Sequence, residues 1–165
     1  MYKKNDYIVY KKYVCKVREI RKNKMNGKDY YILVPITDDS LTIEVPVDNR
    51  MGYIRDIITK EDAEKLIKKI PAIEPLQNMG DKYIEKTYKE LLYNGTLEDL
   101  IRIIKTSYLR NNNRIKNNKK ISDKDKMFFE KAEQYLYNEL SISLNMSFEQ
   151  TKEYIINEVS KLIKN

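Results

Sequence analysis

The chain has 165 residues, of which 41% are apolar and 35% charged, so it can form one ordinary domain or two small ones. It contains no histidine, a single cysteine and four scattered glycines. These absences exclude a Ser-His-Asp triad, a histidine or thiolate zinc site and a glycine-rich phosphate loop. We therefore expect a protein that is not an enzyme and that needs no cofactor or metal.

The net charge of +7 supports two interpretations. A basic protein commonly has a polyanion as its partner, most often nucleic acid. Alternatively, AT-rich coding sequence enriches Lys, Asn, Ile and Tyr together, without any selection for binding. Only the distribution of the charge along the chain can separate these two origins.

Several features predict a cytoplasmic protein with no membrane partner and no small-molecule substrate. The chain has no apolar run of about 18 residues, and its first residues lack the apolar segment of a secretion signal. The lone Cys15 excludes an internal disulfide framework and fits a reducing compartment.

The first 58 residues are predicted to form strands. Short apolar runs are typical of strands, and the pair Asn26-Gly27 is a strong signal for a hairpin turn. Four or five short strands within about 55 residues predict a small, strongly bent sheet or barrel. The predicted strands cover residues 6–10, 13–22, 30–34, 41–45 and 51–55, and residues 30–34 are expected to be central and buried on both faces.

The pattern changes once, at a junction that contains Pro46. The strand over residues 41–45 breaks at residues 46–50 (PVDNR), and a helical pattern begins at Thr59. Everything before the junction indicates β-structure and everything after it indicates helices. We therefore predict an α+β protein, with an N-terminal β module over residues 1–58 and a compact all-helical domain over residues 59–165.

The helical part has clear start and stop signals. Pro71 is expected to end the first helix, and residues 71–80 are predicted to be an extended linker. The apolar stripe of the third helix is expected to include Tyr108 and Leu109, so that Tyr108 belongs to the core. Capping patterns begin at Thr59, Thr96, Ser122 and Ser147.

Basic residues are concentrated between residues 100 and 122, a stretch without a single acidic residue. Compositional bias alone would place carboxylates here too. Such a patch can neutralise several phosphates, which makes binding sensitive to salt. The alternative is a solvated helix end followed by a polar loop, since cations are favourable at a helix C-terminus. The cations are Arg102, Lys105, Arg110, Arg114, Lys116, Lys119 and Lys120.

A second basic segment, residues 16–28, surrounds the predicted hairpin and includes Arg21 and Lys24. The edges of a small sheet must be protected or used, so an exposed edge such as residues 41–45 could add itself to the sheet of a partner. From the sequence alone, an ordinary charged hairpin is the favoured explanation of the basic segment.

Five motifs in chain order resemble the CarD family of bacterial transcription regulators. Residues 6–10 (DYIVY) resemble its opening strand, and residues 41–49 (LTIEVPVDN) resemble its last strand and junction. Residues 52–61 (GYIRDIITKE) resemble the entry to its first helix. Residues 102–110 (RIIKTSYLR) and 132–140 (AEQYLYNEL) are similar to helices of the branch found in Gram-positive bacteria, so the resemblance covers nearly the whole chain.

The resemblance implies a Tudor-like N-terminal module that binds the β subunit of RNA polymerase. A related module occurs in the transcription-repair coupling factor. In the family the contact uses the strand that leads into the junction. The polymerase-binding residues that the resemblance implies here are Arg21, Leu41, Thr42, Ile43, Glu44, Val45 and Pro46.

The resemblance also implies a helical domain that contacts promoter DNA near the upstream edge of the melted region. The family acts by stabilising the open complex, without enzymatic chemistry. The residues that we expect to contact DNA are Met79, Lys82, Lys86, Arg102, Lys105, Arg110, Arg114, Lys119 and Lys120.

The chain departs from the family pattern at two places. Some relatives carry a tryptophan at the start of the second helix, which wedges into the minor groove, and this chain has no tryptophan. Met79 and Tyr83 are nearest by position, and we expect a buried role for both. Glu44 stands where many relatives place a basic residue, so the effect on transcription can differ in strength or direction.

A protein–protein adaptor is the alternative function. Its helical half would bind another protein and no DNA, and its charge would reflect coding bias. A carboxylate-dependent nuclease would require clustered acidic residues, which the basic stretch lacks.

Overall fold

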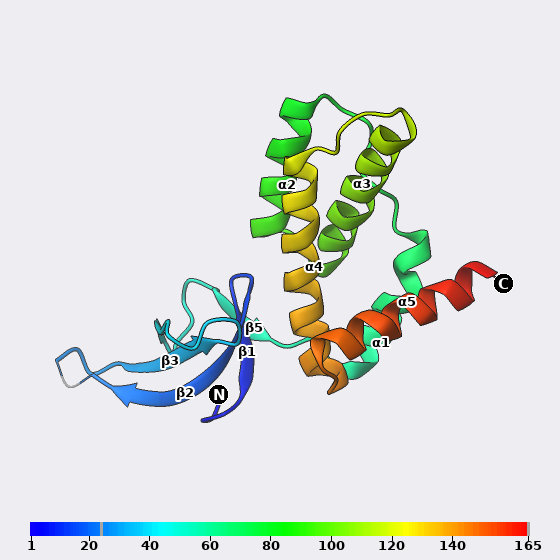
Figure 1. Cartoon of the computed structure of the whole chain (residues 1–165). Helices are drawn as coiled ribbons and strands as arrows, with labels where there is room; N and C mark the ends of the chain where they lie inside the picture. Colours follow the sequence, from blue (N-terminus) through cyan, green and yellow to red (C-terminus); the bar gives the residue numbers. More distant parts are fainter. Residues whose placement is uncertain (24, 165) are drawn as a thin grey trace. The chain divides into compact units, whose positions relative to one another are not determined.

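The structure is a computed structural model that describes residues 1–23 and 25–164 (Figure 1). Lys24, which belongs to the predicted basic hairpin, lies outside the described residues. The chain divides into two compact units, Met1–Ile57 and a second one that begins at Ile58. We describe each unit by itself.

The N-terminal unit is an antiparallel five-stranded sheet in the order β4-β3-β2-β1-β5. Since β4 and β5 end this order, the sheet is open and has two edges. The predicted β module is confirmed. The strands are β1 (Tyr7–Tyr10), β2 (Tyr13–Lys22), β3 (Asp29–Pro35), β4 (Ile43–Pro46) and β5 (Ile54–Asp56).

The centre of the sheet follows the predicted pattern. Consecutive residues Tyr31, Ile32 and Leu33 of β3 are all buried, as expected of a central strand covered on both faces. The register between β2 and β3 shifts between Val17 and Glu19, which is a β-bulge. The bulge explains why the alternation of apolar and polar residues along β2 is imperfect.

The predicted strand over residues 41–45 is wrong at both ends. The strand β4 begins at Ile43 and includes Pro46. The preceding turn continues further than expected, because the Leu41 amide donates to the Asp38 carbonyl at 3.3 Å. Pro46 is accommodated because a proline, which has no N–H, is tolerated in an edge strand.

Asn49 connects the junction to the last strand. Its backbone is left-handed, with φ of 51°, a conformation that Asn adopts more readily than most residues. Its side-chain Nδ2 donates to the Ile54 carbonyl at 3.0 Å, and the Ile54 amide donates to its Oδ1 at 3.2 Å. The asparagine amide therefore imitates a strand neighbour at the start of β5.

The second unit is helical, and the four predicted capping residues are confirmed. Each of Thr59, Thr96, Ser122 and Ser147 accepts a hydrogen bond from a backbone amide three residues later. The helices are α1 (Lys60–Lys69), the short η1 (Ile70–Ala72), α2 (Asp81–Asn94), α3 (Leu97–Lys116), α4 (Asp123–Leu144) and α5 (Phe148–Lys164).

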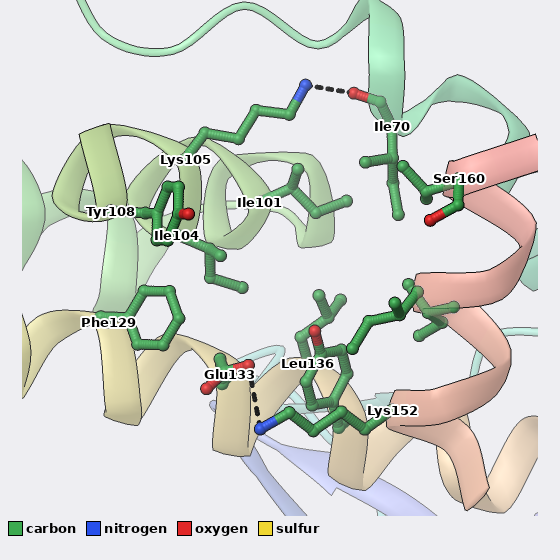
Figure 2. Close-up of a pocket in the computed structure, with 14 residues that line it drawn as sticks. Ile70, Ile101, Ile104, Lys105, Tyr108, Phe129, Glu133, Leu136, Lys152 and Ser160 are labelled. Atoms are coloured by element: carbon green, nitrogen blue, oxygen red, sulfur yellow. Dashed lines mark hydrogen bonds and ion pairs between the residues drawn. The ribbon is translucent and has the colours of Figure 1, made fainter. Parts of the chain in front are cut away.

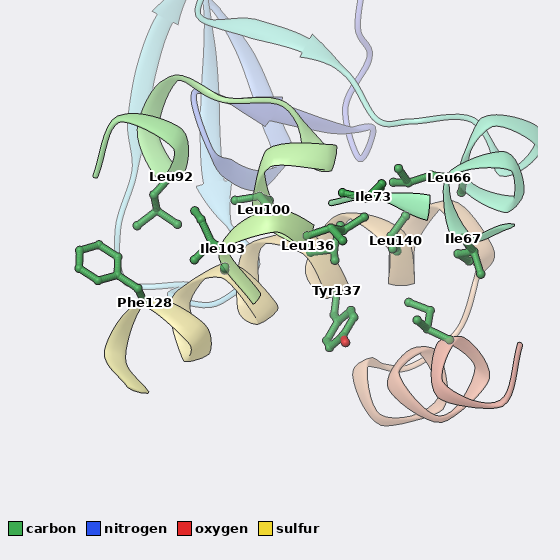
Figure 3. Close-up of a cluster of buried hydrophobic side chains, with 14 of the residues drawn as sticks. Leu66, Ile67, Ile73, Leu92, Leu100, Ile103, Phe128, Leu136, Tyr137 and Leu140 are labelled. Carbon is green, nitrogen blue, oxygen red and sulfur yellow. The ribbon is translucent and has the colours of Figure 1, made fainter. Parts of the chain in front are cut away.

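One continuous apolar core connects these helices (Figure 3). Leu66 and Ile67 of α1, Ile103 of α3 and Leu136 and Leu140 of α4 all lie within it. The core is built mainly around α4, which contacts each of the other four α-helices. None of the described helices is long and apolar enough to cross a membrane.

The expectation that Tyr108 lies in the core is wrong. Its side chain is 58% exposed, and Leu109 is 52% exposed. The buried face of α3 runs through Leu100, Ile103 and Ser107, at helical spacing. Tyr108 and Leu109 follow Ser107 directly, so the helix turns them away from this face.

Candidate functional site

The outer edge of β4 offers unpaired backbone groups. The Val47 amide donates to the Asp29 carbonyl of the β3 side at 3.0 Å. Because amides in an antiparallel strand point alternately to its two sides, Val45 and Ile43 also donate toward β3. The N–H and C=O groups of Glu44 therefore point to the open edge. Pro46 has no N–H, so its position offers no hydrogen-bond donor there.

The side chains of β4 divide between the core and the solvent. Val45 is buried and Ile43 is half-buried, and both pack in the core of the N-terminal unit. Glu44 and Pro46 are exposed, as are Leu41 and Thr42 in the segment before the strand. A strand that pairs with this edge would thus meet the Glu44 carboxylate.

Arg21 lies in the same sheet but not on this edge. It pairs with Tyr30 of β3 from its position in β2, so β3 separates it from β4. Its guanidinium is bound to the Glu19 carboxylate, with Nε donating at 3.1 Å. The structure does not bring Arg21 together with the other predicted polymerase-binding residues.

Lys105, a predicted DNA-contacting residue, is engaged inside the helical unit. Its Nζ donates to the carbonyl of Ile73 at 2.7 Å and to that of Ile70, which Figure 2 shows. Ile70 begins η1 and Ile73 directly follows it, and the Ile70 carbonyl also accepts from the Ile73 amide at 3.1 Å. Burial lowers the pKa of the Lys105 ammonium. Lys105 thus holds the start of the 73–80 segment against α3.

Arg110 is also engaged internally. Its Nε donates to Asp125 Oδ2 at 3.2 Å and its Nη2 to Asp81 Oδ1 at 2.5 Å. Tyr88 donates its hydroxyl to the other oxygen of Asp125 at 2.8 Å, so the buried carboxylate has a partner on each oxygen. Burial acts to lower the pKa of Arg110, but the hydrogen bond from Asp81 and the charge of Asp125 raise it overall.

These contacts show that residues 100–122, which contain no acidic residue, still have carboxylates as neighbours in space. No carboxylate lies between residues 100 and 122 in the sequence, but Asp81 of α2 and Asp125 of α4 lie against it in space. Arg114 is also near Asp81, with 3.8 Å between Nη2 and Oδ2. Part of the basic charge is therefore neutralised by neighbouring helices.

Other predicted DNA-contacting cations are accessible. The ion pairs of Arg110 with Asp81 and of Lys124 with Glu85 bring the start of α2, the last turns of α3 and the start of α4 together. Lys82, Lys86, Lys119 and Lys120 are exposed on these same elements and on the loop after α3.

Arg102, Met79 and Tyr83 lie in different environments. Arg102 is half-buried, and its Nε has no hydrogen-bond partner in the part of the chain that the structure describes. Met79 packs against the helical core, and the Thr87 hydroxyl lies 3.6 Å from its sulfur. The buried role expected of Tyr83 is wrong, because its side chain is 70% exposed on the first turn of α2.

The predicted linker between the first two long helices is packed rather than free. Ile73 is buried, and the Leu76 amide donates to Thr106 Oγ1 of α3 at 2.9 Å. Thr106 in turn donates to the Arg102 carbonyl at 2.6 Å. The 73–80 segment therefore lies along α3 and covers part of the helix that was expected to contact DNA.

A cavity of about 550 Å³ in the helical unit lies between α3, α4 and α5 (Figure 2). Its walls are mostly apolar and include Ile104, Tyr108 and Ile156. Glu133 and Lys152 lie at one side, with 3.9 Å between carboxylate and ammonium. Burial raises the pKa of Glu133. Among the described residues no group of His, Cys, Asp and Glu side chains could hold a metal ion.

Comparison with protein families gives a match for the N-terminal unit of the chain. Residues 2–58 match the family model of the CarD-like/TRCF RID domain, which covers almost the whole N-terminal unit and none of the long helices. No curated protein matches the chain. The N-terminal unit of this protein therefore belongs to the CarD-like family of RNA polymerase-interacting domains.

Proposed function

We propose that this chain is a non-enzymatic transcription regulator whose N-terminal unit binds the β subunit of RNA polymerase through the outer edge of β4. The observation that carries the proposal is the open edge itself, in a domain of the polymerase-interacting family. The outward N–H and C=O groups of Glu44 are the hydrogen-bonding groups that strand addition uses. Val45 keeps the strand anchored because it is buried in the core.

The helical unit contacts promoter DNA in this proposal. The accessible cations Lys82, Lys86, Lys119 and Lys120, with Arg114, are suited to phosphate contacts. Tethering to polymerase makes the DNA contact effectively intramolecular, so a low intrinsic affinity for DNA is sufficient. About 1.4 kcal/mol of preferential binding to the open complex shifts its population about tenfold.

Tyr83 is the residue that we assign to the position of the tryptophan wedge in relatives. Its exposed ring is adjacent to Lys82 and one turn before Lys86. An exposed aromatic ring can stack on an unstacked base, whereas the thioether of Met79 is packed against the core. The assignment replaces Met79 with Tyr83 in the set of DNA-contacting residues.

The lifetime of the open complex on a purified promoter tests the proposal. Addition of the protein should change this lifetime, and the Tyr83→Ala and Lys82→Glu variants should reduce the change. A lifetime that is the same with and without the protein, at concentrations that saturate polymerase, would contradict the proposal.

An adaptor function is the second candidate, and two observations favour it. Lys105 and Arg110 are engaged in contacts within the helical unit, which weakens the case for DNA. The apolar cavity between α3, α4 and α5 could receive part of another protein. An adaptor would show no salt-dependent DNA binding, even with polymerase present.

A further inference from the structure

A second surface of the N-terminal unit has an unusual combination of charge and apolar area. A groove of about 510 Å³ lies on the face formed by β1, β2 and β3, between the turn before β1 and the segment after β3. Tyr7 of β1 is directly opposite Lys16 of β2, and Lys16 is directly opposite Val34 of β3. Directly opposed residues share one face of a sheet, so these three side chains form a row across the groove.

Three cations lie around the groove. Lys4, Lys16 and Arg18 line it, and none of them forms an ion pair with any residue that the structure describes. The Lys16 ammonium lies over the Tyr7 ring, 5.8 Å from its centre. Elsewhere in the same unit Arg21 and Arg50 do form ion pairs, with Glu19 and Asp48.

The β-bulge contributes to this concentration of charge. Lys16 and Arg18 are two residues apart, which places them on the same face of β2. The register shift between Val17 and Glu19 leaves Arg18 without a partner residue on β3. A bulge commonly re-aims the side chain at its position, and here the side chain that it affects lines the groove.

Apolar side chains complete the lining. Tyr7 is 38% exposed and Ile36 is 39% exposed, so both offer apolar surface to a ligand. A ligand that fits must therefore bring negative charge together with apolar surface. Simple anions satisfy only the first of these requirements.

We propose that this groove binds a short acidic peptide segment of a partner protein, with one aromatic or large aliphatic side chain against Tyr7 and Ile36 and its carboxylates near Lys4, Lys16 and Arg18. The carboxylate of Asp39, which also lines the groove, opposes a continuous phosphate backbone. The Asp39 carboxylate is compatible with a peptide segment whose negative charges are separated by uncharged residues. The groove shares no residue with the β4 edge, so this inference does not depend on docking to polymerase.

The test is a titration of the full-length protein, labelled with ¹⁵N, with the acetylated and amidated peptide Asp-Glu-Phe-Glu-Asp. We expect saturable shifts of the amides of Tyr7, Lys16, Arg18 and Ile36, and an affinity that falls about tenfold between about 50 mM and 200 mM salt. The Lys16→Glu/Arg18→Glu double variant should lower the affinity at least about tenfold. Lys28→Glu, an exposed lysine of the same unit outside the groove, should change it less than about twofold.

Two further ligands test which chemical class of ligand the groove prefers. The peptide Asp-Glu-Gly-Glu-Asp, which lacks the ring, should bind at least about fivefold more weakly, because its apolar contact is lost. Five-residue oligothymidylate, with a similar charge, should bind more weakly than the phenylalanine peptide. The proposal is overturned by an absence of saturable shifts in the groove, by equal losses in the groove variant and Lys28→Glu, or by a preference for the oligonucleotide.

Discussion

Arg110 Nε lies 3.2 Å from Asp125 Oδ2, and this pair joins α3 to α4 inside the helical unit. The Asp125 side chain is only 3% exposed and that of Arg110 is 19% exposed. Tyr88 donates to the second oxygen of the same carboxylate, so one buried network connects α2, α3 and α4. A residue that resembles a phosphate-binding cation in the sequence is therefore part of the fold.

Replacement of Arg110 should destabilise the protein. Arg110→Ala leaves the Asp125 carboxylate buried without its cation, and we expect a loss of about 3–5 kcal/mol in the free energy of unfolding. Arg114→Ala is the matched control. Its ion pair with Asp81 is long and the aspartate is exposed, so the loss should be below about 1 kcal/mol. Urea denaturation measures both, and similar losses for the two variants would contradict the structure.

DNA binding in the presence of polymerase should depend on the accessible cations. Lys119→Ala/Lys120→Ala should weaken binding uniformly across promoter sequences, because contacts with phosphates carry no sequence information. Each lost phosphate contact should reduce the slope of log affinity against log salt by about 1. Lys68→Ala, an exposed lysine of α1, is the control and should leave the slope unchanged. An unchanged slope in the double variant would favour the adaptor function.

Glu133 should make stability depend on pH. Burial raises its pKa in the folded protein above the usual carboxyl value, so the folded state holds this proton more tightly than the unfolded state does. The stabilising contribution of this group is thus present at low pH and lost as pH rises through its folded pKa. Glu133→Gln should raise the Tm at pH 7 relative to the native protein, and the difference should shrink toward pH 4. A Tm gain that does not vary with pH would contradict this assignment.

Cys15 offers a probe of the N-terminal unit alone. Burial raises the pKa of its thiol to about 12, so almost no thiolate exists at pH 8 in the folded state. The thiolate is the reactive form, and unfolding returns the pKa to about 8.5. We expect a thiol reagent such as dithiobis(nitrobenzoic acid) to react at least about 100-fold faster in urea than with the native protein. Fast labelling of the native protein would show that Cys15 is not buried.

The parts of the structure that sequence could predict are those with a local cause. Thr96 and Ser147 cap their helices through contacts with residues three positions away. The strand β3 follows from its continuous apolar run. These features need no information about distant residues.

The parts that sequence could not predict depend on neighbours in space. The acids that engage Arg110 come from α2 and α4, so an acid-free stretch of sequence gives no sign of them. The carbonyls that bind Lys105 come from Ile70 and Ile73, more than 30 residues earlier in the chain, so the sequence around Lys105 gives no sign of them. The exposure of Tyr83 and Tyr108 likewise depends on how each helix is rotated about its axis, which helix propensity alone does not determine.

Equilibrium binding of the full-length protein to the RNA polymerase β subunit tests the central claim most directly. Glu44→Pro removes the one outward N–H of β4 between Ile43 and Pro46, while the bonds of Val45 and Ile43 to β3 remain. Glu44→Ala removes only the side chain and is the matched control. We predict that Glu44→Pro weakens binding at least about tenfold with an unchanged Tm, and that Glu44→Ala retains binding. Equal binding by the native protein and Glu44→Pro would contradict docking through this edge.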